Sequence, residues 1–220
     1  IDQCELSPLD SWRVNARSVS ILSDLCKNYG ARLVQISTDH FFTGDANTSH
    51  DENASVTLLN DYARCKYAAE AFALINMENL VVRVNLVGFR NWDAPTFVEW
   101  AIDLIENDRD GILFEDNFVS SIDTPSCASA IFDLISLKES GIYNISSRDV
   151  FSKKDFILAM AKSLGKELSN VTTGSVTSMQ TGRAESLGLD VAKAEKILGY
   201  ALPTLSEVVN SLTANYRKAI

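Results

Sequence analysis

Several features that would define a protein class are missing from this chain of 220 residues. No apolar run approaches the roughly 18 residues of a membrane-spanning helix, and the N-terminus lacks a charged-then-apolar signal sequence. Lys and Arg number 20 against 29 for Asp and Glu, which gives a net charge of −9. This balance argues against binding to nucleic acid or to an anionic membrane surface. We therefore expect a cytoplasmic protein whose partners include neither.

Patterns for metal ions and disulfides are also scarce. The chain has only two histidines, His40 and His50, and its four cysteines show no Cys-x-x-Cys spacing. Cysteines within apolar or helical patterns are usually buried free thiols rather than parts of a disulfide scaffold or zinc site. We expect free thiols and no metal site.

Strand and helix patterns alternate along the chain. Residues 33–37 and 79–84 form short apolar runs typical of buried parallel strands, and residues 141–146 form a third. Capped helical patterns lie between and after them, among them residues 152–164 and 205–219. Such alternation predicts an α/β fold with a parallel sheet.

Tyr62 and Lys66 form the pair with the clearest chemical meaning. Their spacing of four residues places them on one face of a helix. An ammonium beside the phenol would favour the phenolate and lower the pKa of Tyr62 from about 10. Such a pair suits acid/base work on a carbonyl, but the spacing alone is weak evidence. The alternative is a half-buried Tyr62 and a solvated Lys66.

Thr38 and Asp39 follow the first predicted strand directly. They therefore lie at its carboxyl end, where open α/β sheets bind their ligands. This position puts them within reach of Tyr62 if the helix packs against the sheet.

These motifs together resemble a known family. Residues 37–39 (Ser-Thr-Asp) end a strand, residues 41–44 (Phe-Phe-Thr-Gly) follow, and Tyr62-x-x-x-Lys66 comes next with Glu70. This order resembles the extended short-chain dehydrogenase/reductases. Within them the chain is most similar to the dTDP-4-dehydrorhamnose reductase group of sugar-nucleotide reductases, whose catalytic spacing the separation of Thr38 and Tyr62 matches.

The resemblance implies a role for each motif residue. Tyr62 would be the general acid, Thr38 would hydrogen-bond the substrate carbonyl, and Lys66 would bind the nicotinamide ribose and tune Tyr62. NADPH or NADH would supply hydride. The implied contacts are Ser37, Lys66 and Asn85 for the cofactor, and His40, Leu86 and Arg183 for the substrate.

The substrate contacts depart from the family pattern or have ordinary alternatives. His40 replaces a Tyr and Leu86 replaces a Trp of the reductases, so the identity of the sugar is open. His40 is equally well read as a loop residue facing water, and Leu86 as pocket wall or core. Arg183 is equally well read as a surface residue that pairs with Glu185.

The glycine-rich phosphate loop of the family is absent, because no Gly-x-x-Gly-x-x-Gly occurs in the chain. We expect a fragment of a longer protein rather than a relic that has lost its cofactor. On this interpretation residues 1–85 are a partial NAD(P)-binding Rossmann domain with the catalytic residues. Residues 86–220 are mainly a smaller, mixed α/β substrate-binding lobe, with 116–146 returning to the sheet.

The expected activity is reduction of the 4-keto group of a nucleotide-linked deoxysugar, as in dTDP-rhamnose biosynthesis. A nucleotide sugar would be the partner, and a homodimer is considered. Two alternatives stay open. One is a non-catalytic, nucleotide-binding regulatory homologue, which the changes at His40 and Leu86 favour. The other is a sugar-nucleotide epimerase or dehydratase; dehydratases usually carry an acidic pair after the Thr, whereas here Asp39 is followed by His40.

Overall fold

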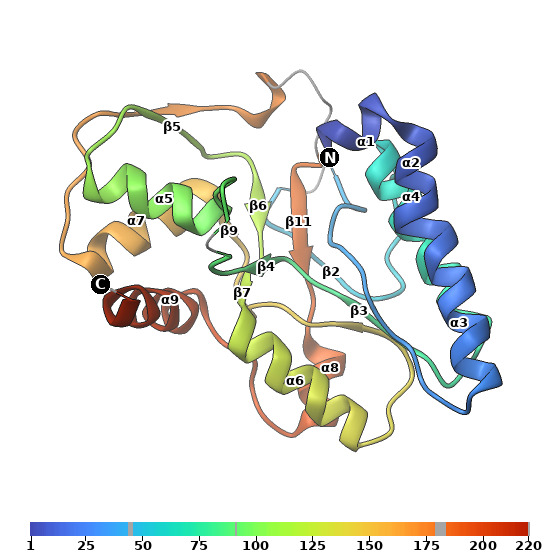
Figure 1. The fold of residues 1–220 in the computed structure, drawn as a ribbon. Helices are drawn as coiled ribbons and strands as arrows, with labels where there is room; N and C mark the ends of the chain where they lie inside the picture. The colour runs from blue at the N-terminus through green and yellow to red at the C-terminus, as the bar shows by residue number, and fades with distance from the viewer. Residues whose placement is uncertain (44–45, 91, 179–183, 220) are drawn as a thin grey trace.

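Parallel strands at the centre of the molecule carry helices on both sides (Figure 1). The computed structural model describes residues 1–43, 46–90, 92–178 and 184–219. The strands are β1 (Val34–Ile36), β2 (Ser49–His50), β3 (Leu80–Arg83), β4 (Leu86–Val87), β5 (Gly111–Phe114), β6 (Phe118–Val119), β7 (Ile122–Asp123), β8 (Gly141–Asn144), β9 (Phe151–Ser152), β10 (Val171–Gly174) and β11 (Ser186–Leu189).

The helices alternate with these strands. They are α1 (Asp2–Leu6), α2 (Pro8–Trp12), the π-helical turn η1 (Arg13–Arg17), α3 (Ser18–Asn28), α4 (Asp61–Leu74), α5 (Phe97–Glu106), α6 (Thr124–Ser136), α7 (Lys153–Leu164), the 3-10 turn η2 (Val176–Ser178), α8 (Ala192–Leu198) and α9 (Leu205–Ala219). None of the helices within the described ranges has the length and apolar character needed to cross a membrane.

The central sheet has the strand order β1-β3-β8, and both pairings are parallel. β3 is buried along its whole length, as its continuous apolar sequence predicts for a strand covered on both faces. β1 lies at an edge, with Ile36 opposite Val82. The register brings the residues that follow β1 beside those that follow β3.

Two groups of helices flank this sheet (Figure 1). The blue and teal helices α3 and α4 pack against one face, and α6 and α8 pack against the other, while α5, α7 and α9 form a separate group at the left of the view. One apolar core lies among α5, α7 and α9, and another joins β3 and β8 to α6 and α8. The α/β class with parallel strands is thus confirmed. Among the described pairings, only that of β6 with β9 is antiparallel.

Three local details add to the sequence analysis. A π turn at Arg13–Arg17 lies between α2 and α3, and α3 ends before Gly30, whose φ of +65° suits glycine. The short strand β2 pairs with the distant β11. Cys65 and Cys127 are buried free thiols as expected, but Cys4 and Cys26 are only partly buried.

A buried ion pair ties α4 to the central sheet. Arg83, the last residue of β3, donates to both carboxylate oxygens of Glu70, with distances of 2.9 and 2.8 Å. Each side chain is only 3% exposed. Arg83 also lies over the ring of Phe41, 5.2 Å from its centroid. A bidentate pair of this kind fixes the helix against the strand end.

We predict that Glu70→Gln destabilises the fold by about 3 kcal/mol, because it leaves the Arg83 charge buried without its partner. Urea denaturation measures the effect. The matched control is Arg109→Gln, which removes an exposed pair with Asp103 (61% and 45% exposed). That change should cost less than about 1 kcal/mol. Equal effects of the two variants would contradict the structural importance of the buried pair.

Candidate active site

A cavity of about 580 Å³ lies where β1 and β3 end. Its lining includes seven of the residues predicted from the sequence: Ser37, Thr38, His40, Tyr62, Lys66, Asn85 and Leu86. The eighth, Arg183, lies outside the described residues. The separate predictions for the strand ends and for the Tyr-x-x-x-Lys helix therefore meet at one place.

Local sequence explains how Tyr62 reaches this cavity. The Asn60 side chain accepts a hydrogen bond from the Ala63 backbone N–H at 2.9 Å, so α4 begins at Asp61. Tyr62 is then in the first helical turn and Lys66 in the second. Their shared helix face points to the cavity at the carboxyl ends of the strands.

Thr38 and Tyr62 line the same cavity, and the Thr38 side chain favours the ionised form of the Tyr62 phenol. Burial raises the pKa of Tyr62 above its ordinary value; Thr38 opposes this, and the charges of Asp39 and Cys4 add to it. The lowered pKa expected from Lys66 is therefore wrong for this structure. The cause is desolvation of the phenol, which the spacing of Tyr62 and Lys66 could not reveal.

Lys66 is held by the edge strand. Its Nζ donates to the Ile36 carbonyl oxygen at 2.6 Å. Burial lowers the pKa of Lys66, and the nearby Glu70 carboxylate opposes that shift. The ammonium therefore lies at the cavity wall, where it bonds a backbone carbonyl.

Asp39 lies at the centre of a buried hydrogen-bond chain. Asn85 donates its side-chain Nδ2 to Asp39 Oδ2, and Ser121 donates to Asn85 Oδ1 at 2.6 Å. Thr38 Oγ1 lies 3.2 Å from the other oxygen of Asp39. Burial raises the pKa of Asp39, while the His40 ring and the Asn85 hydrogen bond oppose the rise. The chain links Ser121, the residue before β7, to the Thr38 hydroxyl.

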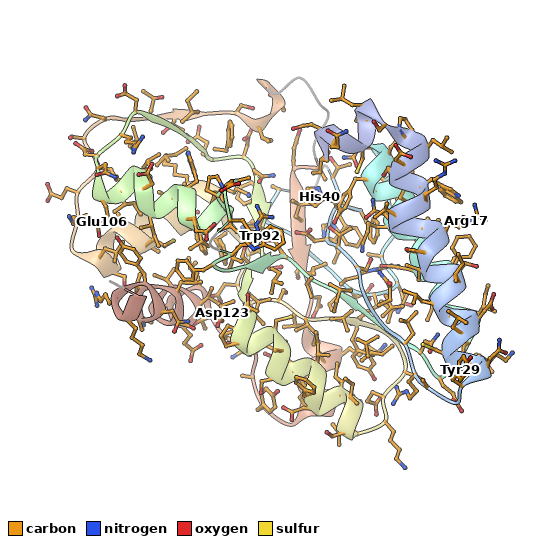
Figure 2. All side chains as sticks on the ribbon, in the orientation of Figure 1. Arg17, Tyr29, His40, Trp92, Glu106 and Asp123 are labelled. Carbon is orange, nitrogen blue, oxygen red and sulfur yellow. The ribbon has the colours of Figure 1, made fainter. Side chains whose placement is uncertain are left out.

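His40, Ser37 and Leu86 complete the polar and apolar parts of the wall. The His40 ring stands edge-on to Tyr62, with centroids 5.9 Å apart. Ser37 is 4% exposed, and its Oγ has no hydrogen-bond partner among the described residues. Leu86 is half exposed, which makes it pocket wall and not core. Figure 2 shows His40 well inside the molecule and Tyr29 at the far end of α3.

Phe97 and Lys153 are among the cavity residues that the sequence analysis did not predict. Phe97 begins α5 and Lys153 begins α7, and the Lys153 Nζ lies 4.0 Å from the centroid of the Phe97 ring. The charge of Lys153 reaches Asp39 and favours its ionised form. Both residues follow an N-cap with a complete capping box, at Thr96 and Ser152. That signal locates the helix starts, but no motif marks these two side chains as cavity residues.

Within the described residues, no group of three or more His, Cys, Asp and Glu side chains is arranged to hold a metal ion. The cavity lining includes the Thr38 hydroxyl, the Tyr62 phenol, the Lys66 ammonium and the buried Asp39 carboxyl.

The parallel sheet, with a cavity at the carboxyl ends of its strands, is a Rossmann-type arrangement. The model of the RmlD substrate binding domain family matches residues 1–218. The chain belongs to this family of RmlD-like sugar-nucleotide reductases. No curated protein sequence matches it.

Solved structures share this fold. The dTDP-4-dehydrorhamnose reductase of Bacillus anthracis, in complex with NADP, has a TM-score of 0.87 and 22% identity; the match covers 98% of this chain and 75% of the other. The corresponding reductase of Clostridium acetobutylicum gives 0.86 and 21%, over 99% and 77%. MoeE5, in complex with UDP-glucuronic acid and NAD, gives 0.75 and 20%, over 94% and 72%. Structural relatives therefore bind NADP or NAD.

We predict that Asp39→Asn raises the melting temperature at pH 7. A raised pKa means that the folded state holds the proton more tightly than the unfolded state, so ionisation of Asp39 costs stability as the pH rises above 3.8. The gain should therefore shrink at pH 4. The control Asp10→Asn, at a side chain that is 72% exposed, should show no comparable pH-dependent gain. The difference in melting temperature between Asp39→Asn and wild type is the quantity to compare. A smaller gain at pH 7 than at pH 4 would contradict the assignment.

Proposed function

We propose that this protein reduces the 4-keto group of a nucleotide-linked deoxysugar, with NADPH or NADH as the reductant and Tyr62 as the general acid. The observation that carries the proposal is that Thr38, Tyr62 and Lys66 line one cavity at the carboxyl edge of the sheet. A carbonyl oxygen placed between the two hydroxyls would meet a hydrogen-bond donor and an acid at once.

The raised pKa of Tyr62 fits this role. A phenol whose pKa is above its ordinary value is protonated at neutral pH, which is the form that an acid needs. As hydride adds to the carbonyl carbon, the oxygen gains charge, and Tyr62 gives it a proton to form the alcohol. The phenolate left behind would be stabilised by the Lys66 ammonium and would recover its proton from solvent.

The nicotinamide end of a dinucleotide would lie in this cavity. The bound cofactor would supply two electrons and a hydrogen as hydride. Ser37 has a buried, unpartnered hydroxyl on the wall, and Lys66 has an ammonium that could also bond ribose oxygens. Asn85 already bonds Asp39 and Ser121, so its contribution would be to position Asp39. The proposal requires a phosphate-binding loop from a segment other than these residues.

The substrate would lie across the cavity from the cofactor. His40 and Leu86 line the wall there, and Arg183 is proposed as a further contact on sequence grounds alone. On this assignment residues 1–85 carry the cofactor and catalytic groups, and residues 86–220 carry mainly the substrate. Strand β8, from the 116–146 segment, pairs with β3 in the central sheet.

A non-catalytic homologue that binds nucleotides is the second candidate. The observation that favours it is the pair of changes at the cavity wall, His40 and Leu86, where the reductases carry Tyr and Trp. Calorimetry with NADPH and NADH, on this chain and on the product of the complete gene, is the first discriminating experiment. Binding by neither would remove the reductase proposal and leave the second candidate.

We predict that Tyr62→Phe lowers the turnover of the complete gene product about 10²–10⁴-fold, because it removes the proton donor. Binding of the cofactor and the nucleotide sugar should change little. The assay is the oxidation of NADPH or NADH with a 4-keto sugar nucleotide. Tyr67→Phe is the control on the same helix, at a partly exposed position, and should stay within about twofold of wild type. Unchanged turnover in Tyr62→Phe would exclude Tyr62 from the mechanism.

A further inference from the structure

The Thr38 hydroxyl needs a proton to donate if it is to hydrogen-bond a substrate carbonyl. A hydroxyl has one proton and two lone pairs. One lone pair of Thr38 accepts the His40 backbone N–H at 3.3 Å. The Asp39 carboxyl is a further neighbour, with its Oδ1 3.2 Å from Thr38 Oγ1. The direction of the hydrogen bond between Thr38 and Asp39 therefore decides whether the Thr38 proton is available to a ligand.

An ionised Asp39 would use this proton. A carboxylate only accepts hydrogen bonds, so Thr38 would have to donate to it. A protonated Asp39 would reverse the bond, because its O–H would donate to the second lone pair of Thr38. The Thr38 proton would then be left for a ligand in the cavity. The protonated form is therefore the one that lets Thr38 act as the donor in the proposed reaction.

A buried chain of hydrogen bonds fixes which oxygen of Asp39 would hold the proton. Ser121 donates to Asn85 Oδ1 at 2.6 Å, which turns the amide so that its Nδ2 donates to Asp39 Oδ2. Oδ2 is thus an acceptor, and Oδ1, which faces Thr38, is the oxygen left to be protonated. Asp39 is 1% exposed and Ser121 is 2% exposed. Ser121 does not line the cavity, so its effect on a ligand passes through Asn85 and Asp39.

Burial favours the protonated form of Asp39. It is the largest cause of the raised pKa of Asp39, and it outweighs two cations that favour the carboxylate. These are the His40 ring, whose Nε2 lies 3.9 Å from Asp39 Oδ1, and the Lys153 ammonium of α7. The Tyr62 phenol of α4 also interacts with the charge of Asp39. A ligand in the cavity would exclude water and disfavour the carboxylate further.

We propose that Asp39 positions the Thr38 hydroxyl by acting as a carboxylic acid: Asp39 Oδ1–H donates to Thr38, and Thr38 donates to the substrate carbonyl. Asp39 keeps its proton throughout, and the proton that completes the alcohol comes from Tyr62. Ser121 and Asn85 hold the carboxyl in this orientation. The inference rests on the proposed function and adds to it positioning residues for the same reaction.

Two substitutions of Asp39 in the complete gene product separate this role from that of a carboxylate. An asparagine offers an N–H to Thr38 and an oxygen to Asn85, as a protonated aspartate does, whereas an alanine offers neither. We expect the kcat of Asp39→Asn to be about 10–100-fold higher than that of Asp39→Ala. The kcat of wild type should also fall with rising pH relative to that of Asp39→Asn, because only wild type can form the carboxylate.

Ser121→Ala tests the buried end of the chain. Without the Ser121 hydroxyl, Asn85 can turn its oxygen to Asp39 and accept the proton there, so kcat should fall about 3–10-fold while KM changes less than about twofold. Ser121→Thr keeps a hydroxyl and should recover most of the loss. Ser120→Ala is the matched control, because Ser120 is equally buried but accepts from the Leu189 backbone N–H at 2.9 Å, outside the chain. Its kcat should stay within about twofold of wild type.

Infrared spectroscopy tests the protonation of Asp39 without turnover. The difference spectrum between wild type and Asp39→Asn should show the C=O band of a carboxylic acid at pH 5, where an aspartate with the ordinary pKa is about nine-tenths ionised. Three results would overturn the inference: absence of that band, a kcat of Asp39→Asn as low as that of Asp39→Ala, and equal losses of kcat in Ser120→Ala and Ser121→Ala. The infrared result needs no hydride transfer. Failure of this inference is therefore distinguishable from failure of the proposed reductase, which the Tyr62→Phe assay tests separately.

Discussion

The parallel pairing of β1 with β3 is the constraint on which the rest of this structure depends. Ile36 lies opposite Val82, so the chain leaves both strands at the same edge of the sheet. That register sets Thr38 and Asp39 next to Asn85 and lets one cavity collect groups far apart in sequence. A shift of the strand pairing by one residue would turn these side chains to the other face of the sheet, and they would no longer line one cavity.

Burial then decides the chemistry of the groups that the register assembles. It raises the pKa of Tyr62 and Asp39 and lowers that of Lys66, and in each case it is the largest cause. The Thr38 hydroxyl has a single proton and two neighbours that can accept it, the phenol and the Asp39 carboxylate. The protonation of Asp39 therefore sets which hydrogen bond Thr38 can donate. Burial therefore determines the direction of each of these pKa shifts, which the spacing of the residues along the helix does not reveal.

Elements with strong local signals were predictable from the sequence. The buried apolar run gave β3, a complete capping box and an apolar stripe gave α7, and the amphipathic pattern gave α9 with its bounds at Leu205 and Ala219. The convergence of Thr38, Tyr62 and Lys66 was also expected, because helix and strand periodicity determine where side chains point. These are properties of neighbouring residues.

Properties set by distant residues were not predictable. The two-residue strand β2 exists because it pairs with β11, whose sequence lies far away. The upward direction of the Tyr62 pKa depends on burial by several elements, and Lys153 reaches the site only because α7 packs beside α5. Family resemblance identified the motif residues, but it gave no reason to single out Lys153.

Transfer of deuterium from the reduced cofactor tests the central claim most directly. The complete gene product would be incubated with NADPH or NADH deuterated at the transferable position and with a 4-keto sugar nucleotide, and the product would be examined by NMR. The account predicts one deuterium on the former carbonyl carbon for each cofactor oxidised. Product formed without net oxidation of the cofactor would indicate an epimerase or dehydratase, and an absence of product and of oxidation would contradict the assignment of the Tyr62 cavity as a reductase site.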